Sequence, residues 1–111
     1  MSKDVYTIDK ICAIAAPIAT KYGLPFLYIF GSYARGTASS ASDIDFLVDT
    51  TGTQLTSLFK LGALYMDLEA AFNKSIDLIT VSSFQQPAQL PSEIEFRNTA
   101  WKEKVKIYDA V

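Results

Sequence analysis

The chain has 111 residues, of which half are hydrophobic, 13% are aromatic and 20% are charged. This length fits a single globular domain, residues 1–111, which can bury a core but leaves no room for a second domain over a substrate. Ten basic and twelve acidic side chains give a net charge of −2. That balance argues against direct nucleic-acid binding driven by phosphate neutralisation.

The residue types that are missing restrict the chemistry. The chain has no histidine, which excludes imidazole as a general base or a metal ligand. The single cysteine, Cys12, excludes an intrachain disulfide, fits a reducing compartment and is expected to pack in a helix. The N-terminus has no signal-peptide pattern, and no apolar run reaches the ~20 residues that span a bilayer. We therefore expect a cytoplasmic protein without a membrane partner.

The first half of the chain predicts a helix followed by two strands. Apolar residues at spacings of three and four predict a helix over residues 8–22, which Pro17 should bend or leave with one unpaired carbonyl. The apolar run 26–30, between a proline and a glycine, predicts a buried strand. A short helix is expected at 33–35 and a loop at 36–42, before an alternating strand at 44–48.

The second half predicts two helices that alternate with strands. The longest helical pattern covers residues 53–72, and a third strand is expected at 75–81. Ser92 and Glu95 have the spacing of a capping box for a last helix ending near Lys104, and residues 105–108 could form a final strand. Phe96 and Trp101 in that helix fit either the core or a partner-facing patch, and core is the more common place for such residues.

Three acidic residues stand at the expected starts of strands. Asp43 and Asp45 are separated by one residue, so on a strand they share a face about 6.6 Å apart. Asp77 opens the third expected strand; on a neighbouring strand, about 4.8 Å away, it would lie beside them. Such a set could hold two Mg²⁺ ions together with substrate phosphates, for in-line phosphoryl or nucleotidyl displacement, with Asp77 placed to take a proton from the attacking hydroxyl.

A possible phosphate site precedes these acids. Gly31 and Ser32 follow a buried strand and open the short helix, so backbone N–H groups and the Ser32 hydroxyl can face a phosphate. Arg35 adds a positive charge. Each feature alone is more commonly a turn, an N-cap or a solvated strand end, but the acids in this order would repel one another without a cation.

These motifs resemble a known family. Gly31-Ser32-Tyr33-Ala34-Arg35-Gly36, then Ser42-Asp43-Ile44-Asp45-Phe46-Leu47-Val48, then Ile76-Asp77-Leu78-Ile79 is similar to the minimal nucleotidyltransferases of the DNA polymerase β superfamily. The resemblance implies an α+β (α/β) fold, a mixed β-sheet flanked by helices. It also implies transfer of a nucleoside monophosphate from an NTP, with ATP expected, to a hydroxyl, using two metal ions and releasing pyrophosphate.

The resemblance also implies residue roles and a partner. Asp43 and Asp45 would be ligands to both Mg²⁺ ions, and Asp77 would be the third ligand and the activator of the acceptor hydroxyl. Gly31 and Ser32 would bind the triphosphate, and Arg35 matches a basic position of the motif. Many members of this class resemble antitoxins paired with a HEPN-domain ribonuclease toxin, and active ones add AMP to a tyrosine of that toxin.

Two other functions stay open at this point. The same fold could neutralise a partner sterically, as a nucleotide-binding or partner-binding module that does not use its acids. Nucleotidyl transfer to a small molecule is a third hypothesis. It is less favoured, because the chain is too short to supply a second domain that would cover the acceptor. The loop over residues 37–41 carries no charge that would mark the acceptor, so the acceptor and the base pocket are left unassigned.

Overall fold

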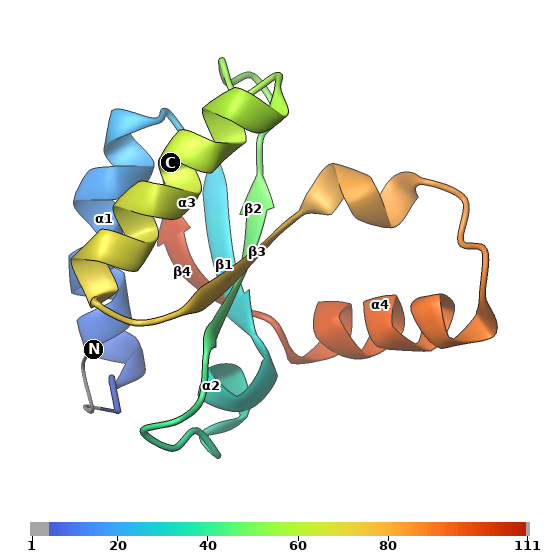
Figure 1. The fold of residues 1–111 in the computed structure, drawn as a ribbon, viewed down its shortest axis with the longest axis horizontal. Coiled ribbons are helices and arrows are strands. Elements are labelled where there is room, and N and C mark those ends of the chain that lie inside the picture. The colour runs from blue at the N-terminus through green and yellow to red at the C-terminus, as the bar shows by residue number, and fades with distance from the viewer. Residues whose placement is uncertain (1–4, 111) are drawn as a thin grey trace.

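The structure, a computed structural model, describes residues 5–110 and consists of a small mixed sheet with helices on both faces (Figure 1). The elements in chain order are α1 (Ile8–Lys21), β1 (Phe26–Phe30), α2 (Gly31–Arg35), β2 (Ile44–Asp49), α3 (Leu58–Phe72), β3 (Ile76–Thr80), the 3₁₀ helix η1 (Val81–Gln85), α4 (Pro91–Glu103) and β4 (Val105–Asp109). This α+β arrangement confirms the expected fold class.

The sheet has the strand order β3-β2-β1-β4. Strand β1 is antiparallel to both β2 and β4, whereas β3 is parallel to β2. A parallel neighbour needs a crossover connection, and α3 supplies it. The crossover brings the starts of β2 and β3 to the same edge of the sheet.

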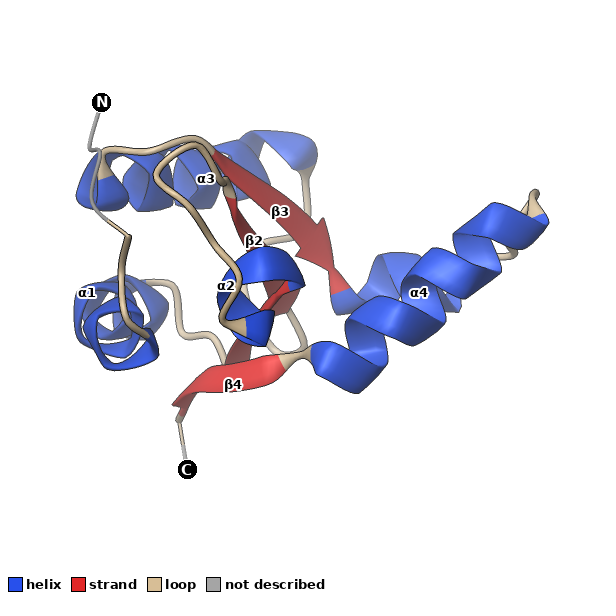
Figure 2. Cartoon of the chain, turned by 90° about the horizontal axis from the view of Figure 1, so that it is seen from below, coloured by secondary structure: helices blue, strands red, loops and turns tan. Residues whose placement is uncertain are grey.

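Helices α1 and α3 cover one face of the sheet (Figures 1 and 2). Every second residue of β2 points into this layer, because side chains alternate between the faces of a strand. The core between helices and sheet is mainly apolar; its large buried members include Ile11, Leu24, Leu27, Ile29, Ile44, Phe46, Leu64, Leu68 and Phe72. Cys12 packs at the edge of this core, as expected.

Helix α4 lies on the opposite face, where Figure 2 shows it extending away from the sheet together with η1. A smaller cluster of Phe30, Leu47 and Ala100 joins α4 to the sheet. The Phe96 ring packs edge-on against Phe30, with centroids 5.9 Å apart. Phe96 and Trp101 are nevertheless 48% and 47% exposed, so the expectation that they belong to the core holds only for one side of Phe96.

Two expected helix starts are wrong. Helix α3 begins at Leu58 rather than near Thr53, because Ser57 caps it by accepting a hydrogen bond from the Lys60 N–H at 3.2 Å. Residues 53–57 instead form a turn, in which the Thr53 hydroxyl donates to the Thr50 carbonyl at 2.7 Å. No side chain caps α4, which starts at Pro91, so the capping box expected at Ser92 and Glu95 is absent.

Helix α1 follows its expected bounds closely. Thr7 caps it by accepting from the Lys10 N–H at 3.1 Å, and Tyr22 ends it. Pro17 lies inside the helix on its exposed side, where water can pair with the carbonyl that proline leaves free. Within residues 5–110, no helix is both long and apolar enough to cross a bilayer.

Candidate functional site

Two of the three acids lie directly opposite each other in the sheet. The parallel register of β2 and β3 pairs Asp45 with Asp77 and Ile44 with Ile76. Because Ile44 and Ile76 point into the core under α1 and α3, the two aspartates point to the other face, the one that α4 flanks. Asp43, exposed, immediately precedes β2. The structure thus meets the condition set in the sequence analysis, that Asp77 lies on the strand next to Asp45.

The Asp45 carboxylate differs in its pKa from an ordinary surface carboxylate. The pKa of Asp45 is raised from 3.8 to about 6. Burial is the main cause, followed by a hydrogen bond with the Asp77 carboxyl and by the negative charges of Asp77 and Asp43, while Arg35 acts in the opposite direction. Like charges held this close favour either a shared proton or a bound cation.

The donor set suits a magnesium ion only in part. Carboxylate oxygens are its preferred protein ligands, and Mg²⁺ usually takes one or two carboxylates and completes its shell with water and substrate phosphates. Asp45 and Asp77 fit that pattern. In the part of the chain that the structure describes, no three acidic, histidine or cysteine residues come together closely enough to hold a metal by themselves.

Gly31 brings the backbone of the β1–α2 junction against Asp45. Its φ of +71° is in the left-handed region, which a side chain disfavours. A Cβ atom at Gly31 would also overlap the Asp45 carboxylate oxygen Oδ2. Glycine is therefore required both for the turn and for the close approach, and Gly31 and Ser32 line the same cavity as Asp45.

Arg35 is placed beside the same site, but its charge is already engaged. Its Nη1 atom donates to both oxygens of Glu103 at 3.0 and 3.1 Å, and the Gly31 N–H donates to the same carboxylate at 3.0 Å. Glu103 was not found from the sequence. The available signal was a carboxylate in the last turn of a helix, a position where the helix dipole disfavours negative charge.

These groups line a shallow cavity of about 330 Å³. Gly31, Ser32, Arg35 and Asp45 form one wall, and Thr99 and Glu103 of α4 are on the other. Larger cavities lie beside Trp101 and beside Asn73. Charge and hydrogen-bond donors, rather than size, identify the cavity next to the aspartates as the candidate site.

A buried lysine holds the loop between α2 and β2 in place. Lys74 is only 5% exposed and its Nζ donates to the Ser40 carbonyl at 2.8 Å. Within the loop, the Ser39 N–H donates to the Ser42 hydroxyl at 2.9 Å. Lys74 thus fixes the loop that leads into Asp43.

The sequence and the fold are similar to those of known proteins. The profile of the family described as "Polymerase beta, Nucleotidyltransferase" matches residues 14–109. A candidate protein adenylyltransferase of Methanocaldococcus jannaschii is 38% identical over 76 residues, which are 68% of this chain and 80% of that protein. The protein adenylyltransferase MntA of Thermococcus cleftensis is 38% identical over 65 residues, 59% of this chain and 64% of the relative.

Solved structures share the fold at lower identity. A toxin–antitoxin crystal structure with AMP-PNP superposes with a TM-score of 0.67 at 19% identity, covering 89% of this chain and 73% of the other. A second toxin–antitoxin structure gives a TM-score of 0.63, also at 19% identity, covering 95% of this chain and 75% of the other. At this identity the match concerns the fold: the sheet with its flanking helices.

Proposed function

Because the chain belongs to the polymerase beta nucleotidyltransferase family and is a nucleotidyltransferase, we propose that it transfers AMP from ATP to a tyrosine hydroxyl of a partner protein, a HEPN-type toxin that this modification inactivates. The observation that carries the proposal is the pairing of Asp45 with Asp77 across β2 and β3, next to the Gly31–Ser32 junction. Relatives that are named protein adenylyltransferases support the choice of AMP and of a protein acceptor.

The chain's own residues would act in a single displacement. The acceptor oxygen forms a bond to the α-phosphorus of ATP, the bond from that phosphorus to the β-phosphate bridging oxygen breaks, and pyrophosphate leaves. Asp77, exposed at the start of β3, would accept the proton of the acceptor hydroxyl. The Ser32 hydroxyl and the free N–H groups of the first turn of α2 would bind the β- and γ-phosphates.

Asp45 and Asp77, which the strand register brings together, would hold Mg²⁺ with the triphosphate, and Asp43, just before β2, would be the third ligand in that complex. Bound there with the triphosphate, the metal would neutralise charge on the phosphates and stabilise the attacking and leaving oxygens. The raised pKa of Asp45 supports this assignment, since a cation is the group that relieves the repulsion between neighbouring carboxylates. The cavity beside α4 is shallow and open to solvent, which suits a large protein acceptor better than a small molecule.

Labelled ATP tests the proposal directly. The purified protein is incubated with Mg²⁺, the co-purified partner, and ATP labelled at either the α- or the γ-phosphate. We expect label on the partner from α-labelled ATP alone, on a tyrosine, and none with the Asp45→Asn variant. Label from γ-labelled ATP, or equal label with the variant, contradicts nucleotidyl transfer by this site.

Two observations favour the alternative of a steric antitoxin. The residues that the structure describes bring together no three-ligand metal cluster, and Glu103 already occupies the Gly31 N–H and Arg35. The double variant Asp43→Ala with Asp45→Ala separates the two functions in a cell-protection assay with the toxin. Loss of protection supports the enzyme, whereas full protection supports steric neutralisation.

A further inference from the structure

One carboxylate of α4 connects both ends of α2. The Glu103 side chain accepts a hydrogen bond from the N–H of Gly31, the first residue of α2, and from Nη1 of Arg35, the last one. Only 19% of the Glu103 side chain is exposed, compared with 49% for Arg35. Glu103 is therefore fixed between α4 and α2 rather than free in solvent.

Neither helix explains this arrangement by itself. Helix α2 has five residues, well below the length at which an isolated helix is stable in water. Glu103 lies in the last turn of α4, where negative charge opposes the helix dipole. The three hydrogen bonds to Gly31 and Arg35 offset that cost, and they hold a helix that could not persist alone.

The position of α2 matters because Gly31 lies against Asp45. There is no room for even a Cβ atom between them, so a displacement of Gly31 by a fraction of an ångström changes the surroundings of the Asp45 carboxylate. The same displacement would move the Ser32 hydroxyl and the first-turn N–H groups. Preorganised donors of this kind lose much of their effect when they are misplaced by about 1 Å.

We propose that Glu103 is a positioning residue of the nucleotidyltransferase site, which clamps Gly31 and Arg35 so that α2 presents its donors to the triphosphate beside Asp45. The inference rests on the proposed function and deepens it. It also changes the role of Arg35, which acts together with Glu103 to hold α2 instead of serving as a free ligand of the phosphates. Helix α4 thereby becomes part of the site, whose cavity it lines with Phe96, Thr99 and Glu103.

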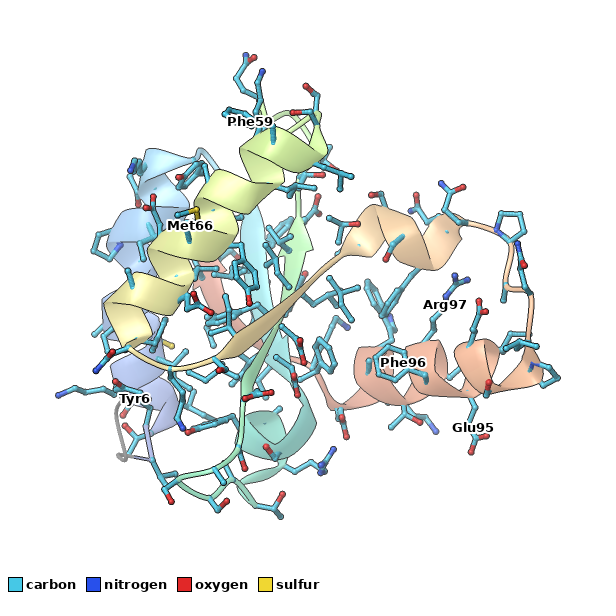
Figure 3. The ribbon with its side chains drawn as sticks, viewed as in Figure 1. Tyr6, Phe59, Met66, Glu95, Phe96 and Arg97 are labelled. Carbon is cyan, nitrogen blue, oxygen red and sulfur yellow. The ribbon has the colours of Figure 1, made fainter. Side chains whose placement is uncertain are left out.

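The test compares two glutamates of the same helix. Glu103→Ala removes the clamp, Glu103→Gln keeps an oxygen that can accept from Gly31, and Glu95→Ala is the matched control. Glu95 is exposed and points away from Phe96 and Arg97 (Figure 3). Two quantities are measured for each variant: calorimetric affinity for Mg·ATP, and amide hydrogen exchange of peptides covering residues 30–36 against those covering α3.

We expect Glu103→Ala to weaken Mg·ATP binding on the order of ten-fold, as loss of a supporting hydrogen-bond partner does at other sites. Exchange should accelerate at residues 30–36 and not in α3, and Glu103→Gln should restore part of both properties. Glu95→Ala should match the wild type. If Glu103→Ala accelerates amide exchange throughout the chain, the Glu103→Gln variant decides between a local and a global effect. That variant should accelerate exchange at α2 alone and weaken Mg·ATP binding.

Three results would overturn the proposal. Unchanged exchange at residues 30–36 would mean that Glu103 does not hold α2. Unchanged binding would mean that α2 does not need the clamp, and tighter binding would mean that Glu103 competes with phosphate for Gly31 and Arg35. Wild-type protein that binds no Mg·ATP would instead contradict the proposed function, and the exchange measurement would still decide whether Glu103 clamps α2.

Discussion

Asp45 and Asp77 face each other across two parallel strands, on the sheet face that α4 flanks. The pair combines burial with like charge, and both raise the pKa of Asp45. Repulsion between the Asp45 and Asp77 carboxylates does not stabilise the fold. Carboxylates perturbed in this way are typical of sites whose stabilising ligand is a cation or a substrate.

We predict that Asp45→Asn abolishes nucleotidyl transfer without harming the fold. Removing one carboxylate takes away both a metal ligand and the repulsion with Asp77, so transfer should fall by about 100-fold or more while the melting temperature at neutral pH stays equal or rises. Transfer assays and thermal unfolding without metal measure the two effects. Asp49→Asn, at the far end of the same strand, is the control, and equal loss of transfer in that variant would contradict a specific role for Asp45.

The same pair should make stability depend on pH. The folded pKa of Asp45, about 6, lies above its ordinary value of 3.8, so between these values the folded chain holds a proton that the unfolded chain releases. The free energy of unfolding that Asp45 contributes is therefore present at low pH and is lost as the pH rises through about 6. Subtracting the melting temperature of the Asp45→Asn variant from that of the wild type at each pH isolates this contribution.

In metal-free buffer, the wild type should lose stability relative to Asp45→Asn as the pH rises across that window. Added Mg²⁺ should return stability to the wild type near neutral pH and leave the variant unchanged, because the cation favours the charged carboxylate. A difference that stays constant with pH would show that Asp45 titrates as an ordinary aspartate.

We predict that Gly31→Ala lowers the free energy of unfolding more than Gly36→Ala, the same change at another glycine with a left-handed backbone. Gly31 and Gly36 have φ values of +71° and +77°, so both alanine variants bear the strain of this conformation, about 1–2 kcal/mol. At Gly36 the added methyl group meets open space, whereas at Gly31 it overlaps the Asp45 carboxylate. Urea unfolding should show the larger loss for Gly31→Ala, together with loss of Mg·ATP binding.

Equal destabilisation of the two variants would mean that the overlap at Gly31 is relieved by movement of Asp45. In that case nucleotide binding would still distinguish them, because a displaced Asp45 no longer faces Asp77. Retained binding in Gly31→Ala would exclude close packing of Gly31 and Asp45 as a requirement of the site.

The sequence predicted the sheet and the acids because their signals are local. Alternation along 44–48 places Asp45 on the face opposite Ile44, whereas the pairing of β2 with β3 is set by long-range contacts that only the structure shows. The start of α3 was misplaced because Leu55 continues the apolar spacing of the helix. In the structure the Leu55 N–H instead donates to the Thr53 hydroxyl, which holds this segment outside the helix. Glu103 was beyond reach, since its partner Gly31 lies 72 residues away and no spacing rule links a helix end to a distant loop.

Lys74 offers a prediction on the loop that leads to Asp43. Its side chain is 5% exposed, and its ammonium group donates to the Ser40 carbonyl at 2.8 Å. Burying a charged group is costly unless it is hydrogen-bonded, and this bond offsets that cost. The bond closes the loop over residues 36–42 against the start of β3, so Lys74 contributes to the geometry between Asp43 and Asp77 as well as to stability.

Lys74→Met keeps the length of the buried stem and removes the donor. We expect a loss of about 1–3 kcal/mol in the free energy of unfolding, because the Ser40 carbonyl loses its partner, and faster amide exchange over residues 37–43. Lys60→Met, an exposed lysine of α3, should change neither quantity appreciably. If Lys74→Met instead stabilises the chain while the loop stays protected, the cost of burying the ammonium exceeds the worth of its bond, and the loop is held by the Ser39–Ser42 contact alone.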